Sequence, residues 1–226
     1  SSLLISFCIF FNNSYFINLQ NMSSNLDYND MSSLKDLFIY SESSKILCAE
    51  NEGVRGVKTI NRYIKKNFID KSKLSSVIGY YPGKLMMINK NNKMLDLYNG
   101  DSGILVTFKN DSCLYFMVKK ASNIVKNEGK VDDKIFKLGD FTFYPLRLIT
   151  QNEIDMSYAI TIHKSQGSDY KNILVILPNS KGHPLLNRQI IYTAITRTKG
   201  NTYILSNLDR LNEAKDTVII RDTNIA

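Results

Sequence analysis

The feature that most constrains the fold is a change of pattern at Pro82-Gly83, within a chain of 226 residues. Short runs of β-prone residues follow it, at 85–88, 104–108, 114–118 and 141–148. Asn-Gly, Asn-Asp and Gly-Asp turns separate these runs. Strands this short and this closely spaced are typical of a small barrel. We therefore predict a compact β module over about residues 83–150, separate from the rest of the chain.

On either side of this block, strand-like and helix-like segments alternate. Residues 45–49 read as a buried strand and residues 55–68 as a helix. Later segments are predicted as a helix at about 155–166, a strand at 173–177, a helix at 188–197 and a strand at 202–205. This alternation favours a mostly parallel sheet with helices on both faces. Residues 12–44, rich in Asn, Ser and Asp, are expected to form loops with one short helix.

The predicted helix at 55–68 is strongly amphipathic. One face carries Val57, Ile60, Ile64 and Phe68, and the opposite face carries Lys58, Arg62, Lys65 and Lys66. The basic face has two interpretations, a solvated helix surface or a surface that faces DNA.

The net charge of the chain is +8, from 29 Lys and Arg against 21 Asp and Glu. This excess fits a polyanionic partner, although it also serves solubility alone. Cys8, Cys48 and Cys113 suit neither a disulfide framework nor a zinc site, which favours a reducing, cytoplasmic setting and no metal. The apolar run 3–11 has about half the length that spans a bilayer, and no basic residue precedes Lys35. Neither a membrane span nor a signal peptide is expected.

Two polar motifs indicate a surface that binds phosphates. The first, at 159–167, gathers hydroxyl, imidazole, ammonium and amide donors and ends on Gly167. The second, at 192–199, places Arg197 at the end of an apolar, helix-length run. Such donors bind the phosphates of a nucleotide or of a nucleic-acid backbone.

The runs TIHKSQGS, at 161–168, and IYTAITRTK, at 191–199, resemble motifs V and VI of superfamily 1 DNA helicases. The HKSQG spelling is similar to the RecD-like branch, the alpha subunit of exodeoxyribonuclease V and its relatives. Two upstream segments strengthen the likeness. Residues 46–61 resemble the opening of the second motor domain in that family, and residues 84–103 resemble the small barrel inserted there.

The resemblance implies an α/β fold, a RecA-like second motor domain with an inserted SH3-like barrel. The motor domain would comprise residues 45–82 and 151–226, and the barrel residues 83–150. Residues 1–44 would be an irregular remnant of the upstream inter-domain region. We expect the chain, which opens on Ser1 rather than Met, to be the C-terminal piece of a longer protein.

The resemblance also implies a nucleotide-facing set of residues. Arg197 matches the motif VI arginine that stabilises charge on the γ-phosphate across the cleft between two motor domains. The alternative is an arginine that caps a helix C-terminus, where a positive charge is favourable to the helix dipole. Gln166 and Gly167 match the point where motif V turns toward the nucleotide. Asp169 stands where family members often carry Glu, so its ribose or metal-linked contact is one methylene short.

A second set is expected to contact DNA. Thr161 and His163 match motif V positions that meet the DNA backbone in related helicases, and Lys164 and Ser165 are candidates for the same track. Taken alone, His163 would be read as a core histidine. Asn99 belongs to an Asn-Gly-Asp segment that predicts a hairpin turn, and a contact with DNA from the barrel is a weaker expectation.

Two departures from the family bear on activity. RecD-like proteins carry an arginine in a Ser-x-Arg-Phe-type run, whereas the nearest match here, at 6–10, has none. The phosphate-loop pattern G-x-x-x-x-G-K-[ST] is also absent from the 226 residues. ATP and Mg²⁺ would therefore be bound mainly by an N-terminal motor domain outside this sequence, and the fragment alone would not hydrolyse ATP.

The sequence as a whole predicts the C-terminal motor domain of an ATP-dependent 5′-to-3′ DNA helicase that acts in recombinational repair. Its expected partners are single-stranded DNA and the other subunits of an exodeoxyribonuclease V complex. The main alternative is a catalytically dead DNA-binding remnant or scaffold subunit. An RNA-directed helicase is a third option, because backbone contacts say little about the sugar.

Overall fold

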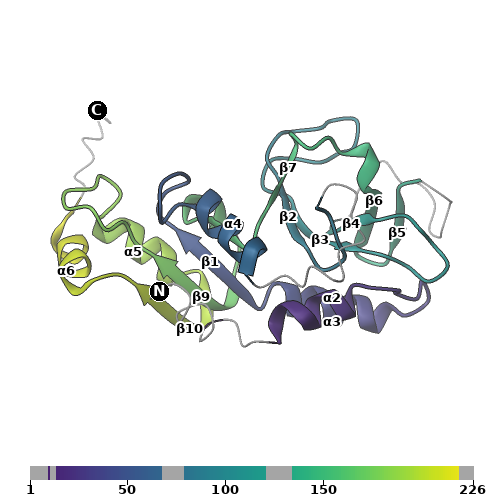
Figure 1. Cartoon of the computed structure of the whole chain (residues 1–226), viewed down its shortest axis with the longest axis horizontal. Coiled ribbons are helices and arrows are strands. Elements are labelled where there is room, and N and C mark those ends of the chain that lie inside the picture. Colours follow the sequence, from purple (N-terminus) through teal and green to yellow (C-terminus); the bar gives the residue numbers. More distant parts are fainter. Residues whose placement is uncertain (1–9, 11–13, 68–78, 121–133, 219–226) are drawn as a thin grey trace, which may run out of the picture. The chain divides into compact units, whose positions relative to one another are not determined.

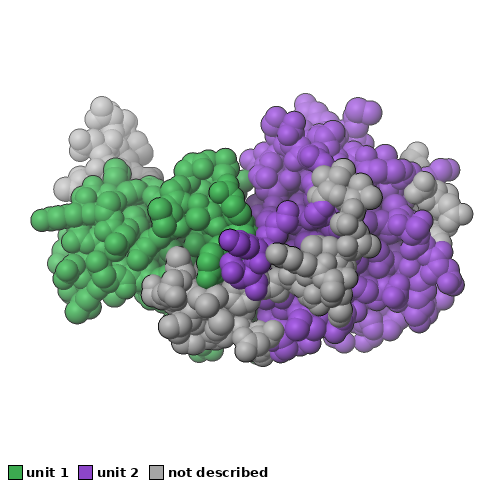
Figure 2. Space-filling model, viewed as in Figure 1, with its two compact units in different colours: residues 1–10, 43–63, 159–226 green, residues 11–42, 64–158 purple. Residues whose placement is uncertain are grey.

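A computed structural model describes residues 10, 14–67, 79–120 and 134–218, and its elements are shown in Figure 1. The chain divides into two compact units, coloured separately in Figure 2. The first unit comprises residues 1–10, 43–63 and 159–226, and the second comprises residues 11–42 and 64–158. Each unit has its own sheet, and the two sheets share no strand among the described residues.

The first unit is built on a four-stranded parallel sheet with the order β10-β9-β1-β8. Strands β10, β9 and β1 are labelled in Figure 1. Its strands are β1 (Ser44–Cys48), β8 (Ala159–Thr161), β9 (Tyr170–Ile176) and β10 (Thr198–Leu205). All five residues of β1 are buried, so both faces of this inner strand are covered. The predictions of a buried strand here and of a mostly parallel sheet are confirmed.

Helices α5 (Arg188–Ile195) and α6 (Leu208–Asp216) belong to this unit, and α4 (Val57–Asn67) begins in it and ends in the second unit. On α4, Ile60 and Ile64 are buried and the four basic residues are exposed, which confirms the predicted amphipathic pattern. Phe68 lies outside the described residues. Helix α5 begins after Asn187, whose side-chain oxygen accepts a hydrogen bond from the Ile190 N–H at 2.9 Å.

The prediction of a helix at 155–166 is wrong. This segment holds β7 (Ile154–Met156), β8 and a short 3-10 turn, η3 (His163–Ser165). The local pattern allowed a helix, but residues 159–161 pair with residues 46–48 of β1 in parallel register. Pairing with a strand more than 100 residues away decides the conformation, and β-branched Ile160 and Thr161 fit a strand well.

The second unit contains a six-stranded antiparallel sheet with the order β5-β6-β4-β3-β2-β7. Besides β7, its strands are β2 (Leu85–Ile88), β3 (Ser102–Val106), β4 (Tyr115–Lys119), β5 (Phe136–Leu138) and β6 (Phe141–Pro145), and a 3-10 turn, η2 (Leu146–Leu148), follows. Each of the four predicted runs therefore contains a strand. The three-residue strands β5 and β7 were not predicted.

The antiparallel sheet encloses a core of its own. Leu97, Leu105, Phe116 and Tyr144 are fully buried in it, alongside other apolar side chains of the same sheet. In the described part of the chain, no pairing joins the edge strands β5 and β7. The SH3-like barrel therefore stays a prediction.

Residues 12–44 differ from the prediction of loops with one short helix. They form two helices, α2 (Tyr15–Met22) and α3 (Met31–Ser41), which belong to the unit of the antiparallel sheet. Leu19, Leu34 and Leu37 are fully buried on them. Polar composition favoured loops, but buried apolar side chains, among them Tyr15 and Phe16 on α2, give each helix a face that packs. Among the described residues, no helix is long and apolar enough to cross a membrane.

Candidate functional site

The motif at 159–167 leaves the parallel sheet at the carboxyl end of β8. The Ile162 N–H donates to the Cys48 carbonyl at 2.9 Å, which continues the pairing with β1 by one residue. The Thr161 hydroxyl oxygen then accepts from the Lys164 N–H at 3.2 Å and starts the turn η3. His163 and Lys164 are exposed on this turn, and Thr161 is half-buried. Three predicted DNA-contacting residues thus lie together at the carboxyl end of the strands, where α/β folds commonly bind ligands.

Ser165 differs from its neighbours. It is 0% exposed, and its hydroxyl donates to the Ile162 carbonyl at 2.6 Å. A side chain held in this way stabilises the turn and does not present its hydroxyl to a DNA phosphate. The expectation that Ser165 contacts DNA is corrected accordingly, because a motif match identifies residue types and not the direction of each side chain.

Gln166 and Gly167 follow η3 and are both exposed. Gly167 has a φ of +87°, and no heavy atom lies within 4 Å of the position that a Cβ atom would occupy. Glycine is therefore required by the backbone conformation and not by crowding. The open space above its Cα leaves room for a ligand to approach the backbone.

Replacing Gly167 by alanine is expected to lower the free energy of unfolding by about 1 to 2 kcal/mol, because an L-residue is strained in this conformation. Gly182 is the matched control, since it has a φ of +69° and equally open surroundings. Urea unfolding should show similar losses for Gly167→Ala and Gly182→Ala. If Gly167→Ala unfolds at the same urea concentration as the wild type, the prediction that alanine is strained at this position is wrong.

Arg197 and Asp169 lie at the opposite end of the strands of the same sheet. Asp169 directly precedes β9, and Arg197 directly precedes β10. Tyr170 pairs with Thr198 at the start of these strands, and the Tyr170 N–H donates to the Arg197 carbonyl at 2.8 Å. The predicted nucleotide-facing residues Asp169 and Arg197 are therefore adjacent, at the amino-terminal ends of β9 and β10. Thr161, His163 and Lys164 lie at the other end of the strands.

The Arg197 guanidinium is only loosely held. Its Nε donates to the Thr193 carbonyl at 3.3 Å, and its Nη2 donates to the Thr196 hydroxyl oxygen at 3.3 Å. Both bonds are longer than the usual 2.9 to 3.0 Å. Among the described residues, no carboxylate forms an ion pair with it. The bond to Thr193 supports the helix-capping interpretation, and the half-buried guanidinium has no carboxylate partner in the described part of the chain.

Asp169 pairs with Lys199, a residue to which sequence reasoning assigned no role. The Lys199 Nζ lies 2.9 Å from the Asp169 Oδ2. The hydrogen bond and charge of Lys199 lower the pKa of the Asp169 carboxyl below its usual value, and Arg197 adds a smaller effect in the same direction. One indication of this pair was present in the sequence, which is that Lys199 belongs to the run that resembles motif VI.

Asn61 positions the motif at 159–167 from the side. Its side-chain amide donates to the Ala159 carbonyl at 2.9 Å, and its side-chain oxygen accepts from the Ala159 N–H at 2.9 Å. Asn61 is 5% exposed. The amide therefore occupies the outer edge of β8 as a further strand would. Asn61 was part of the resemblance, but its contact with Ala159 was not foreseen.

Asn99 belongs to the other compact unit. The Asp101 N–H donates to the Tyr98 carbonyl at 2.9 Å, and Gly100 has a φ of +101°, so the predicted turn is confirmed. The Asn99 backbone N–H donates to the Asn91 side-chain oxygen at 2.8 Å, and the Asn99 side chain is exposed. Its contact with DNA stays a prediction.

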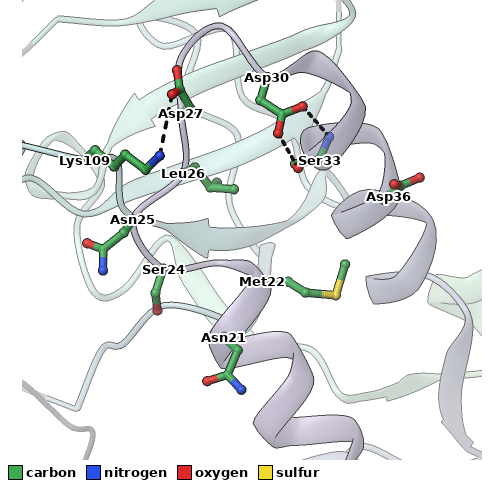
Figure 3. Close-up of a pocket in the computed structure, with 10 residues that line it drawn as sticks. All are labelled: Asn21, Met22, Ser24, Asn25, Leu26, Asp27, Asp30, Ser33, Asp36 and Lys109. Atoms are coloured by element: carbon green, nitrogen blue, oxygen red, sulfur yellow. Dashed lines mark hydrogen bonds and ion pairs between the residues drawn. The ribbon is translucent and has the colours of Figure 1, made fainter.

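The second unit has an open hollow of about 360 Å³, shown in Figure 3. Three aspartates and Lys109 are among its lining residues, and none of the candidate residues described above lines it. Asp30 is engaged with Ser33 as a helix cap, and Asp27 lies 3.6 Å from Lys109. Within the described ranges, no group of three or more His, Cys, Asp or Glu residues could hold a metal ion.

Comparison with known proteins shows that the chain is similar to parts of helicases. A family model for the UvrD-like helicase C-terminal domain matches residues 156–205. The RecD subunit of the RecBCD enzyme from Buchnera aphidicola (Acyrthosiphon pisum) is 31% identical over 170 residues, which are 74% of this chain and 25% of that protein. The Mycobacterium tuberculosis (CDC 1551) RecD subunit is 28% identical over 158 residues, 70% of this chain and 24% of that protein. The chain thus spans about a quarter of the length of these relatives.

Solved structures of Pif1 helicases align with the chain at low similarity. Pif1 from Bacteroides, in complex with ADP-AlF3 and ssDNA, has a TM-score of 0.39 and 19% identity, and covers 85% of this chain and 48% of that one. Pif1 from Candida albicans has a TM-score of 0.41 and 16% identity, and covers 88% of this chain and 54% of that one.

Proposed function

We propose that this chain, which is related to the C-terminal part of RecD-like superfamily 1 helicases, is the second motor domain of an ATP-dependent 5′-to-3′ DNA helicase. One observation carries the proposal. The candidate residues lie at the two opposite ends of the strands of one parallel sheet. Thr161, His163 and Lys164 are at the carboxyl end of β8, and Asp169 and Arg197 are at the amino-terminal ends of β9 and β10. Gln166 and Gly167 are on the segment between them. A single rigid unit can then sense a phosphate at one end and hold a DNA backbone at the other.

The assignment of domains follows from this proposal. The parallel-sheet unit would be the RecA-like part, and the antiparallel sheet the inserted SH3-like barrel, with Asn99 on a loop able to meet DNA. ATP and Mg²⁺ would be held mainly by a phosphate-loop motor domain, because the 226 residues lack that loop. Gln166, Gly167, Asp169 and Arg197 would complete the nucleotide site from this side. Other subunits of an exodeoxyribonuclease V complex would be its partners in DNA repair.

The proposed DNA track rests on exposure and chemistry. His163 and Lys164 lie on the exposed turn η3, and the Thr161 hydroxyl oxygen is already bound to the Lys164 N–H. Imidazole and ammonium groups bind phosphate oxygens without reading the base sequence. Binding should therefore depend on salt and tolerate any sequence, as expected for a motor that moves along a strand.

The double variant His163→Ala/Lys164→Ala is expected to bind single-stranded DNA about 10-fold more weakly at low salt, since one charged hydrogen bond contributes about 1.5 kcal/mol. The slope of log affinity against log salt should become shallower by about 0.7 for each phosphate that the variant no longer neutralises. Fluorescence anisotropy with a labelled oligonucleotide measures both quantities. Single-stranded RNA of the same sequence, measured in parallel, tests the RNA-directed alternative.

Lys215→Ala is the control for this experiment, because Lys215 is an exposed lysine on α6 and its loss changes the net charge by the same sign. Its effect on affinity should be small. If both variants weaken binding equally, only the overall charge of the chain matters and the track assignment fails.

The missing upstream arginine favours a second candidate, a DNA-binding remnant or scaffold subunit without turnover. Under both candidate functions the chain binds DNA at the carboxyl end of the strands. The two functions differ at the amino-terminal end, where only a working motor needs the charge of Arg197. Turnover of ATP in the full-length protein that contains this chain therefore distinguishes them.

A further inference from the structure

Strand β10 begins with a β-bulge. Thr198 pairs with Tyr170 and Asn201 pairs with Asn172, so three steps along β10 face two steps along β9. The extra step falls at Lys199 and Gly200. Bulges of this kind redirect a side chain and often occur beside functional sites.

Specific contacts build this bulge. The Thr198 hydroxyl donates to the Lys171 carbonyl at 3.0 Å and accepts from the Gly200 N–H at 3.1 Å. A Cβ atom on Gly200 would lie 2.3 Å from the Lys171 carbonyl oxygen, so no larger residue fits there without a shift of the backbone. The conformation that presents Lys199 is therefore determined by its two neighbours in sequence.

The presented lysine reaches the carboxylate that precedes β9. Lys199 Nζ and Asp169 Oδ2 are 2.9 Å apart, although the two side chains are 76% and 48% exposed. Exposed pairs of this kind contribute little to stability. Lys199 lowers the pKa of Asp169 by its hydrogen bond and charge, and the charge of Arg197 has a smaller effect in the same direction. Among the residues that the structure describes, only Lys199 is bonded to the Asp169 carboxylate.

We propose that Lys199 is a positioning residue that occupies Asp169 and so prevents this carboxylate from pairing with Arg197. Arginine forms bidentate bonds with carboxylates, so a free Asp169 would compete with a phosphate for the guanidinium. The present bonds of Arg197, both 3.3 Å long, would not resist that competition. The consequence for turnover rests on the proposed function, whereas the competition for Asp169 does not.

The pKa of Asp169 and the Nε resonance of Arg197, both measured by NMR on this chain, test the competition directly. In Lys199→Ala, the pKa of Asp169 should stay below its usual value, because Arg197 takes the place of lysine, and the Arg197 Nε resonance should move. In Lys199→Ala/Arg197→Ala, the pKa should return to the usual value. Lys199→Arg should behave as the wild type. Lys171→Ala removes an exposed lysine from the neighbouring strand and should change neither signal.

Two results would overturn the proposal. One is an Asp169 pKa that returns to its usual value in Lys199→Ala, since Arg197 would then not be the competitor. The other is an Asp169 pKa that stays low in the double variant. Where the protein that contains this chain hydrolyses ATP, Lys199→Ala should lower turnover about 10-fold. An unchanged turnover in Arg197→Ala would refute the proposed function and leave the NMR result standing.

Discussion

Replacing Arg197 by alanine is expected, under the proposed motor function, to lower the ATPase turnover of the protein that contains this chain by about 10³-fold, as for arginines that act across a domain cleft in other motors. Such an arginine stabilises charge that develops in the transition state, so turnover should fall far more than nucleotide affinity. Arg197→Lys should restore little, because a point charge does not reproduce the planar guanidinium. Steady-state ATPase assays in the presence of single-stranded DNA measure the effect.

Arg188 provides the matched control for this prediction. It is an exposed arginine at the first position of the same helix, α5, and its Nε donates to the Lys215 carbonyl at 2.9 Å. Arg188→Ala should leave turnover within about 2-fold of wild type, in keeping with the small effect of most surface changes. A wild-type rate in Arg197→Ala would leave Arg197 with only its bond to the Thr193 carbonyl and a helix-capping role.

The largest expected loss of stability is that of Asn61→Ala, about 3 kcal/mol in the free energy of unfolding. The substitution removes two hydrogen bonds of 2.9 Å and leaves both the N–H and the carbonyl of Ala159 without these partners. Each buried polar group left unsatisfied costs about 1 to 3 kcal/mol. Because Thr161 is two residues further along β8, affinity for single-stranded DNA should fall as well.

Chemical denaturation of the chain measures this effect, with Arg62→Ala as the control. Arg62 is the next residue of α4 and is exposed, so its loss should change stability by less than about 0.5 kcal/mol. Equal stability of Asn61→Ala and Arg62→Ala would mean that water replaces the amide at the edge of β8.

Local sequence predicted the elements in which pattern and environment agree. The strand at β1 and the amphipathic faces of α4 follow from apolar spacing, and α5 begins at the expected place after Asn187. The similarity to RecD-like helicases, which the runs at 161–168 and 191–199 predicted, is also found by the sequence comparisons. The segment 155–166 was mispredicted because pairing with β1 decides its conformation, and its local pattern does not contain that partner.

The sequence by itself determined the residue types of the site, their order and the kind of chemistry they support. Only the tertiary structure decided which of them are accessible and which meet. It buries Ser165, joins Asn61 to a backbone 98 residues away, and places Lys199 on Asp169 through a bulge in β10. The physical reason is that a hydrogen bond forms only when its donor and acceptor atoms lie about 3 Å apart. Residues distant in sequence satisfy that condition only after the strands of the sheet have set their register.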